Sequence, residues 1–191
     1  MKVENAMARR AVFLDRDGVV VIPTFRDGRS YAPTSLEQFK VYPDAAQSVR
    51  RLKQAGYKVV VVTNQPDVGA GRAAQSVVEE MHARLECQMP LDAIMVCYHT
   101  KDQNCDCRKP KPGLLRQAAA EMDIDLVSSV MVGDRASDVE AGVRAGCRTV
   151  FIDRGYTTEL RPEQADRTVT SLAGATDWIL LLDTSTVGAD A

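Results

Sequence analysis

Residues 12–18 read VFLDRDG, an apolar run that ends in two closely spaced carboxylates. Residues 11–14 are apolar without alternation, which is typical of a strand buried on both faces in a parallel sheet. Asp15 and Asp17 lie two positions apart, so both side chains project to one side of an extended segment, and Gly18 lets the backbone turn. Because like charges this close repel each other, we expect a divalent cation beside them.

Two neighbouring carboxylates suit a particular chemistry. One can attack an electrophile such as a phosphoryl group, while the other gives a proton to the leaving group and later takes one from water. The alternative is an ordinary polar loop after a strand, because Asp and Gly are common turn residues. For a single Asp-x-Asp that alternative is the more frequent one, so the rest of the chain has to discriminate between the two.

The composition is that of a globular protein. The 191 residues are 45% hydrophobic and 26% charged, which suits one domain with a substantial core. We expect that domain at residues 10–183, between short tails at 1–9 and 184–191. A net charge of −2 gives no global basic surface for nucleic acid, and no apolar run approaches the length of a membrane span. Residues 1–10, MKVENAMARR, lack the apolar segment of a secretory leader, so a cytoplasmic protein is expected.

Apolar runs and helical spacing alternate along the chain, which predicts an α/β fold with a central parallel sheet. Residues 19–41 contain two prolines and no sustained periodicity, so we expect a long loop beside the carboxylates. His82 is expected on the surface of a helix. The expected strands are 11–14, 58–63, 92–98, 129–132 and 149–153, the last of which closes the sheet, and the expected helices are 43–55, 75–85, 114–122 and a terminal one containing 178–182.

The second expected strand, KVVVVT, ends in the polar residues Thr63, Asn64 and Gln65. Open parallel sheets bind ligands outside the carboxyl ends of their strands, so Thr63 should face the same crevice as Asp15. Its hydroxyl could hold a phosphoryl oxygen. A simple Thr-Asn turn remains an equally good interpretation of these residues alone.

Cysteine and histidine concentrate after the third expected strand, at Cys97, His99, Cys105 and Cys107. Three thiolates and one imidazole make a complete tetrahedral ligand set for Zn²⁺. Because the protein fills all four positions, we expect a structural zinc that staples loop 97–107, with no position left for water. An odd count of five cysteines and the absence of an export signal argue against disulfides.

Charged residues follow the expected zinc loop and the fourth strand. Arg108, Lys109 and Lys111 lie beside two prolines, which makes a stiff basic loop that would attract a phosphate-bearing substrate. A solvated run of charge is the usual alternative. Asp134 and Asp138 lie one helical turn apart, so both can project from the same face at a helix start, although Asp138 also suits a helix cap.

The motifs DRDG, TN, RKPKP and GDRASD, in this order over residues 12–138, resemble those of the haloacid dehalogenase superfamily of phosphohydrolases. The resemblance covers about residues 10–180 on the count of elements in such folds. It implies a Rossmann-like three-layer sandwich with a minimal cap. The stretch CYHTKDQNCDCRKPKPG is similar to the branch that contains heptose bisphosphate phosphatases and histidinol-phosphate phosphatases.

The resemblance also implies roles for individual residues. Asp15 would be the nucleophile that becomes an aspartyl phosphate, and Asp17 the general acid and base. Mg²⁺ would be held by the carboxylate of Asp15, the backbone carbonyl of Asp17 and Asp134, with Asp138 orienting this end of the site. Thr63 and Lys109 would stabilise the transferring phosphoryl group. The implied substrate contacts are Arg108, Asn64, Gln65 and Arg135.

The resemblance leaves the substrate open between two groups. We favour removal of the 7-phosphate of D-glycero-D-manno-heptose 1,7-bisphosphate by a monomeric enzyme whose partner is a small phosphorylated sugar. Histidinol phosphate or another small sugar phosphate is the alternative, because residues 66–72, PDVGAGR, replace a loop that heptose enzymes usually carry. A zinc-stapled module that binds phosphorylated ligands without hydrolysing them is the non-enzymatic alternative.

Overall fold

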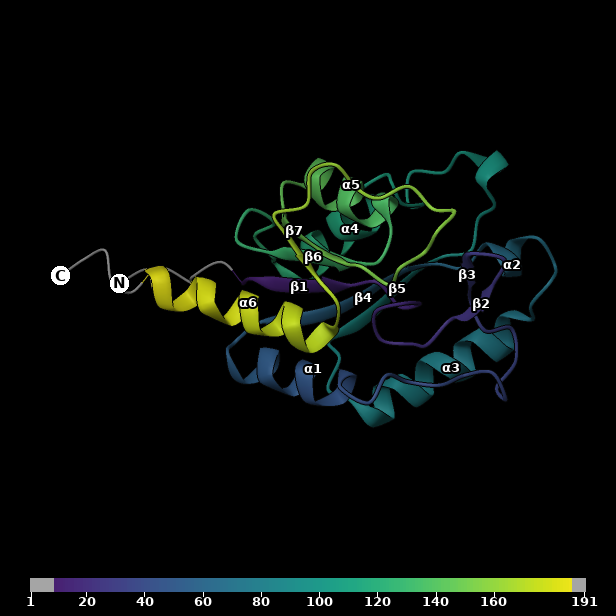
Figure 1. The fold of residues 1–191 in the computed structure, drawn as a ribbon, viewed down its shortest axis with the longest axis horizontal. Helices are drawn as coiled ribbons and strands as arrows, with labels where there is room; N and C mark the ends of the chain where they lie inside the picture. The colour runs from purple at the N-terminus through teal and green to yellow at the C-terminus, as the bar shows by residue number, and fades with distance from the viewer. Residues whose placement is uncertain (1–8, 187–191) are drawn as a thin grey trace.

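The computed structural model describes residues 9–186, and its centre is a sheet of six parallel strands (Figure 1). The strand order is β5-β4-β1-β6-β7-β8. All neighbouring strands pair in parallel. The strands are β1 (Ala11–Leu14), β4 (Lys58–Asn64), β5 (Ala93–Cys97), β6 (Val130–Gly133), β7 (Arg148–Ile152) and β8 (Arg167–Val169).

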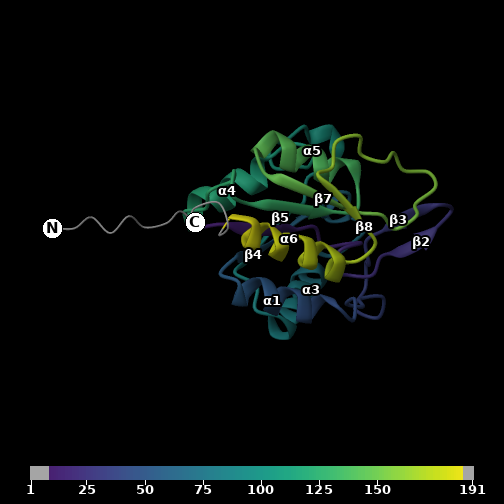
Figure 2. The same ribbon diagram turned by 60° about the vertical axis from the view of Figure 1, so that its left-hand side comes forward.

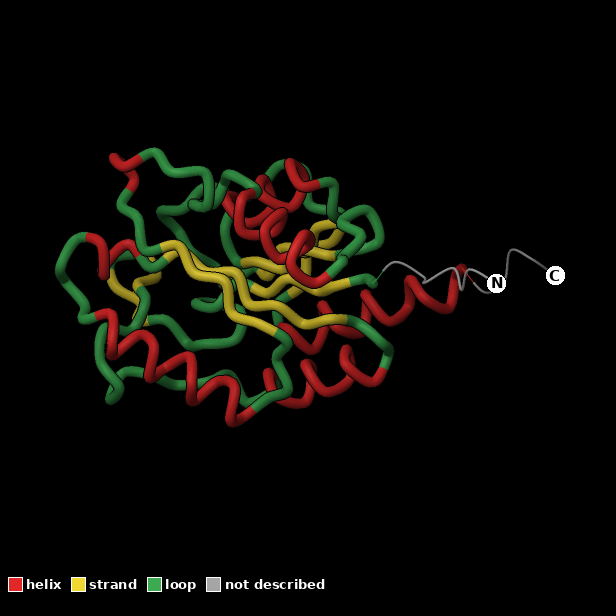
Figure 3. The backbone as a smooth tube through the Cα atoms, turned by 180° about the vertical axis from the view of Figure 1, so that it is seen from behind, coloured by secondary structure: helices red, strands yellow, loops and turns green. Residues whose placement is uncertain are grey.

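Helices cover both faces of this sheet, so the expected three-layer α/β sandwich is confirmed (Figures 1 and 2). One face carries α1 (Ala45–Gln54), α3 (Gln75–Gln88) and α6 (Leu172–Thr186), and the other carries α4 (Gly113–Met122) and α5 (Ala136–Ala145). Figure 3 shows the same arrangement from behind, with the strands between two sets of helices.

The central strand β1 explains why an unalternating apolar run forms here. Val12 and Leu14 pack into the core under α1 and α6, whereas Ala11 and Phe13 pack into the core under α4 and α5. Successive side chains of a strand point to opposite faces, so a strand covered on both sides needs apolar residues at every position. All four residues are fully buried.

The structure corrects three expectations about the elements. The sheet does not close at β7, because β8 adds a sixth parallel strand beyond it. The expected loop 19–41 contains an antiparallel hairpin of β2 (Thr24–Arg26) and β3 (Arg29–Tyr31). Helix α6 continues to Thr186, past the expected start of the C-terminal tail.

The hairpin is a small addition after β1, in agreement with the minimal cap expected. The expected tails fall mostly on residues 1–8 and 187–191, which lie outside the described residues, although Arg9 forms a parallel bridge with Ile124. Among the residues that the structure describes, no helix combines the length and the apolar character that a membrane span requires.

Candidate active site

The carboxyl ends of three adjacent strands bring the expected catalytic residues together. Strand β1 pairs with both β4 and β6. Asp15 follows β1, Thr63 lies near the end of β4, and Asp134 follows β6. All three are buried, with Thr63 and Asp134 at most 2% exposed. The rule that ligands bind at strand ends therefore accounts for the position of this site.

Lys109 lies in the middle of the acidic residues and is itself buried. Its Nζ donates to Asp15 Oδ1 at 2.5 Å and to the Val62 carbonyl oxygen at 2.8 Å, and it pairs with Asp138 Oδ1 at 2.7 Å. Burial alone lowers the pKa of Lys109, but the charges of Asp138 and Asp15 outweigh burial and hold the pKa above its ordinary value. Lys109 is thus a permanent cation beside the Asp15 carboxylate.

Asp15, Asp134 and Asp138 form an acidic cluster in which one oxygen of each residue lies within 4.8 Å of the others. Burial, with the nearby charges of Asp15 and Asp138, raises the pKa of Asp134 well above its ordinary value. Burial raises the pKa of Asp138 to about 6, although Lys109 opposes the shift. Three carboxylates around one cation leave an excess of negative charge, which favours a hard divalent cation.

The two oxygens of Asp134 have different surroundings. Oδ2 accepts a hydrogen bond of 2.7 Å from the hydroxyl of Tyr156. Oδ1 is buried and has no hydrogen-bond partner within residues 9–186. A Cβ added at Gly18 would lie 1.8 Å from Oδ2, so the backbone must approach this carboxylate closely and only glycine fits. An unpartnered buried carboxylate oxygen beside two other acids fits a metal ligand.

Asp17 is held by Arg16, which the sequence analysis did not single out, and by Gln65, which it expected to contact the substrate. The guanidinium of Arg16, which is fully buried, donates to Asp17 through Nε and Nη2 at 3.0 to 3.2 Å. The Gln65 amide donates to Asp17 Oδ2 at 2.7 Å and to Thr63 Oγ1 at 2.8 Å. The side chain expected to transfer protons is therefore fixed from two sides.

His82 contacts the far side of Arg16, which contradicts the expectation that it lies on the helix surface. It is 8% exposed, and its Nε2 lies 3.1 Å from Arg16 Nη1. Burial and the charge of Arg16 lower the pKa of His82 to about 4. The imidazole is neutral near pH 7, and because arginine can only donate, Nε2 is the acceptor. Helix α3 thus supports Asp17 indirectly.

Asn64, one of the expected substrate contacts, binds the backbone of Lys109. Its Oδ1 accepts from the Lys109 amide and its Nδ2 donates to the Lys109 carbonyl, both at 3.1 Å. The Lys109–Pro110 peptide bond is cis. Arg108 Nη1 donates to the carbonyl of His99 at 3.2 Å.

Arg135 contacts the β2–β3 hairpin. Its Nη2 donates to the carbonyl and the hydroxyl of Ser30 at 2.8 and 2.6 Å, and its Nε pairs with Glu159 at 3.4 Å. All four expected substrate contacts therefore make hydrogen bonds within the protein: Asn64, Gln65, Arg108 and Arg135.

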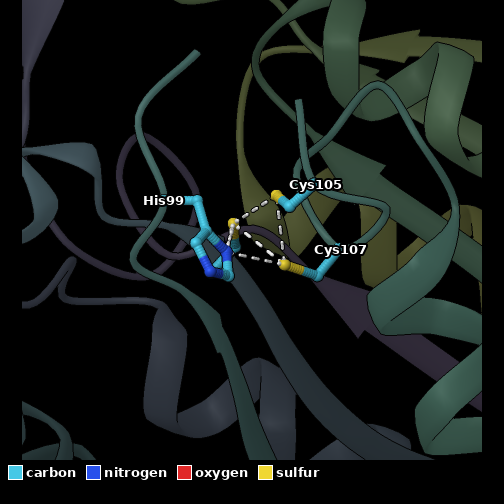
Figure 4. A group of neighbouring side chains, drawn as sticks. His99, Cys105 and Cys107 are labelled. Carbon is cyan, nitrogen blue, oxygen red and sulfur yellow. Dashed lines mark hydrogen bonds between the residues drawn. The ribbon is translucent and has the colours of Figure 1, made fainter. Parts of the chain in front are cut away.

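Cys97, His99, Cys105 and Cys107 converge as expected. Figure 4 shows the side chains of His99, Cys105 and Cys107 pointing toward one another. The three sulfur atoms lie 3.2 to 3.6 Å apart, and His99 Nδ1 lies 3.3 Å from Cys107 Sγ and 3.6 Å from Cys97 Sγ. These separations exceed an S–S bond of about 2.05 Å. They approach the edge of about 3.8 Å that a tetrahedron with Zn–S bonds of about 2.3 Å would have. The four donors could hold a metal ion.

Sequence comparisons identify known relatives of this chain. A HAD-hydrolase-like family model matches residues 106–175. A D-glycero-beta-D-manno-heptose-1,7-bisphosphate 7-phosphatase of Pseudomonas aeruginosa is 38% identical over 154 residues, which cover 78% of this chain and 84% of that protein. The protein of the same name from Helicobacter pylori J99 is 37% identical and covers 71% and 78%.

Solved structures agree. The D,D-heptose 1,7-bisphosphate phosphatase of B. bronchiseptica, complexed with magnesium and phosphate, superposes with a TM-score of 0.76 at 31% identity, over 91% of this chain and 99% of that one. A putative HAD-like phosphatase from Mesorhizobium loti gives 0.72 at 27% identity, over 92% and 87%. The chain therefore belongs to the HAD-like hydrolases and, within them, to the family of bacterial phosphatases named for D-glycero-beta-D-manno-heptose-1,7-bisphosphate.

Proposed function

We propose that this protein is a Mg²⁺-dependent phosphatase that removes the 7-phosphate of D-glycero-β-D-manno-heptose 1,7-bisphosphate through an aspartyl-phosphate intermediate. The observation that carries the proposal is the contact of Lys109 Nζ with Asp15 Oδ1 at 2.5 Å, inside an acidic cluster at the strand ends. The relatives named for this reaction support the choice of substrate.

Asp15 would act as the nucleophile. Its carboxylate oxygen attacks phosphorus, the bond from phosphorus to the sugar oxygen breaks, and Asp17 gives that oxygen a proton. Asp17 then takes a proton from water, which attacks the aspartyl phosphate and releases inorganic phosphate. Lys109 and Thr63 border the reacting group, where negative charge spreads over the phosphoryl oxygens. Arg16 and Gln65 keep the Asp17 carboxylate in place throughout.

Asp15, Asp134 and the backbone carbonyl of Asp17 would hold Mg²⁺. The oxygen donors and the unpartnered Asp134 Oδ1 fit a hard cation. When bound, Mg²⁺ supplies positive charge that offsets the carboxylates and the phosphoryl oxygens. Asp138, paired with Lys109, would orient this end of the site.

Cys97, His99, Cys105 and Cys107 would hold a structural Zn²⁺. The protein fills all four positions, so the ion would fix the loop without taking part in the reaction. Cys107 precedes Lys109 by two residues, and a Cβ on Gly113 would lie 2.2 Å from the Asp106 carbonyl. The cluster therefore supports the segment that carries the catalytic lysine.

A single release assay tests the reaction and the substrate. Heptose 1,7-bisphosphate should release one phosphate with Mg²⁺, faster than histidinol phosphate or fructose bisphosphate, and ³¹P NMR of the product should show the 1-phosphate intact. Faster release from histidinol phosphate would support the alternative substrate. The protein is proposed to act as a cytoplasmic monomer, which light scattering tests for the oligomeric state.

Asp15→Asn tests the nucleophile. It should abolish phosphate release, and beryllium fluoride should bind covalently to the wild-type protein at Asp15 but not to the variant. Asp123→Asn is the control, because Asp123 is exposed at the end of α4 with φ 53°, a conformation that asparagine readily adopts. Phosphate release by Asp15→Asn at the wild-type rate would refute the mechanism. Binding of the sugar phosphate with no release by either protein would favour the non-enzymatic module.

A further inference from the structure

We propose that Tyr156 is a positioning residue that selects which oxygen of Asp134 binds the divalent cation, and that Phe25 of the β2–β3 hairpin holds Tyr156 in place. The inference rests on the proposed role of Asp134 as a metal ligand. It assigns a function to the hairpin, which would set the affinity of the site for the cation.

The hydrogen bond from Tyr156 makes the two oxygens of Asp134 different, because only one of them accepts it. The hydroxyl donates to Oδ2 at 2.7 Å, while Oδ1 is buried without a partner in the part of the chain that the structure describes. A carboxylate free at both oxygens could rotate or bind a cation through either one. Once Oδ2 is occupied by a donor, Oδ1 is the oxygen left for the cation, and its direction is fixed.

Tyr156 owes its own position to the hairpin. It lies in the loop between β7 and β8, and its ring stacks on Phe25 of β2 with the ring centroids 5.8 Å apart and the planes 22° apart. Phe25 is 54% exposed, so its ring covers Tyr156 from the solvent side without belonging to the core. Such aromatic pairs stabilise a contact beyond the area they bury.

Further contacts join this loop to the hairpin, and Figure 2 shows the two segments side by side. Thr158 Oγ1 donates to the Gly28 carbonyl at 2.9 Å. Gly28 has φ +76°, and a Cβ there would lie 2.5 Å from Thr157 Oγ1, so the turn needs glycine. Arg135, the residue after Asp134, donates to Ser30, which pairs with Phe25 across the hairpin. The hairpin is therefore attached both to Tyr156 and to the segment that carries the metal ligand.

Tyr156→Phe tests the hydrogen bond, because it removes the hydroxyl and keeps the ring stacked on Phe25. Binding of Mn²⁺ is followed by the electron paramagnetic resonance of the free ion, with Mg²⁺ as competitor and no substrate present. Removal of such an outer partner typically weakens metal binding about tenfold or more, so the dissociation constants for both ions should rise about tenfold. Turnover at saturating Mg²⁺ should fall much less, because the cation still binds at high concentration.

Two controls locate the effect. Asp134→Ala should abolish the binding that Tyr156→Phe weakens, and Tyr31→Phe, which removes a hydroxyl from the same hairpin while the ring still lies under Arg26, should bind both ions as the wild type does. Phe25→Ala keeps the Tyr156 hydroxyl and removes its support, so a loss of roughly threefold in affinity is expected from the aromatic pair.

Wild-type affinity in Tyr156→Phe would overturn the inference, even if the variant unfolded at a lower temperature. Wild-type affinity in Phe25→Ala would overturn the role of the hairpin. Failure of the proposed reaction is a separate result, because cation binding is measured without turnover. Phosphate release by Asp15→Asn would refute the mechanism and leave the binding measurements standing.

Discussion

Replacing His82 by glutamine should flatten the dependence of folding stability on pH below neutrality. His82 is buried on α3, where its Nε2 accepts a hydrogen bond from Arg16 at 3.1 Å. Glutamine can present an amide oxygen to the same guanidinium but cannot be protonated. The substitution therefore removes the titration of this position and keeps an acceptor for the buried arginine.

The magnitude follows from the pKa of His82. Burial, and then the charge of Arg16, lower this pKa from 6.5 to about 4. Between these values the unfolded chain binds more protons than the folded protein. The stability contributed by neutral His82 is therefore complete above about pH 6.5 and lost as the pH falls toward about 4. The loss amounts to about 2 kcal/mol at about pH 5 and about 3 kcal/mol below about pH 4.

Urea unfolding at about pH 7.5 and about pH 5 measures this effect in the wild type and in His82→Gln. Other groups titrate in the same range, among them Asp138 with a pKa of about 6, but they are common to both proteins. Their contributions cancel when the stability that the variant loses between the two pH values is subtracted from the stability that the wild type loses. The wild type should lose about 2 kcal/mol more than the variant on acidification. Equal losses in the two proteins would show that folding does not lower the pKa of His82, and would refute the reasoning.

The remaining predictions concern three other positions. Gly18→Ala should destabilise the fold by at least about 1–2 kcal/mol in urea and lose Mn²⁺ binding, because φ is +95° and the added Cβ would overlap the acidic cluster. Gly56→Ala, at φ +86° with open space around it, should show the strain without the loss of binding. Asn64→Ala should cost about 1–3 kcal/mol in urea and lower kcat, because both hydrogen bonds to the backbone of Lys109, the proposed catalytic lysine, disappear. Cys105→Ser should lower bound zinc from about one equivalent toward zero by atomic emission, whereas Cys87→Ser, at an exposed cysteine, should leave zinc unchanged.

The sheet could be predicted from sequence where strands are buried on both faces. The run KVVVVT at 58–63 has no other good interpretation, because four consecutive valines need apolar neighbours above and below. Strand β8 could not be predicted. It is an edge strand of three residues, Arg167–Val169, with two exposed side chains, so it carries no apolar run or alternation. The hairpin strands are equally short, and Ser30 is the buried residue of β3.

The candidate site was predictable to the extent that its residues lie at strand ends. Asp15, Thr63 and Asp134 meet because parallel strands share one edge, and this rule needs no knowledge of side-chain packing. Arg16 gave no such signal. An arginine between two aspartates suggests a solvated loop, and complete burial of arginine is rare unless it is paired. Tyr156 lies in a loop with no periodicity, so its contact with Asp134 depends on how that loop meets the hairpin.

These omissions share a physical cause. A motif identifies groups that react, because the chemistry demands particular residue types at fixed spacing. The residues that position the reacting groups need only the right hydrogen-bond donors or acceptors, and many residue types provide these. Asn64 illustrates the difference. A carboxamide offers two donors and one acceptor oxygen, and Lys109 occupies that oxygen and one donor. Asn64 should therefore influence every phosphoester substrate alike, through the position of Lys109, whereas a residue that contacts the sugar would discriminate between substrates.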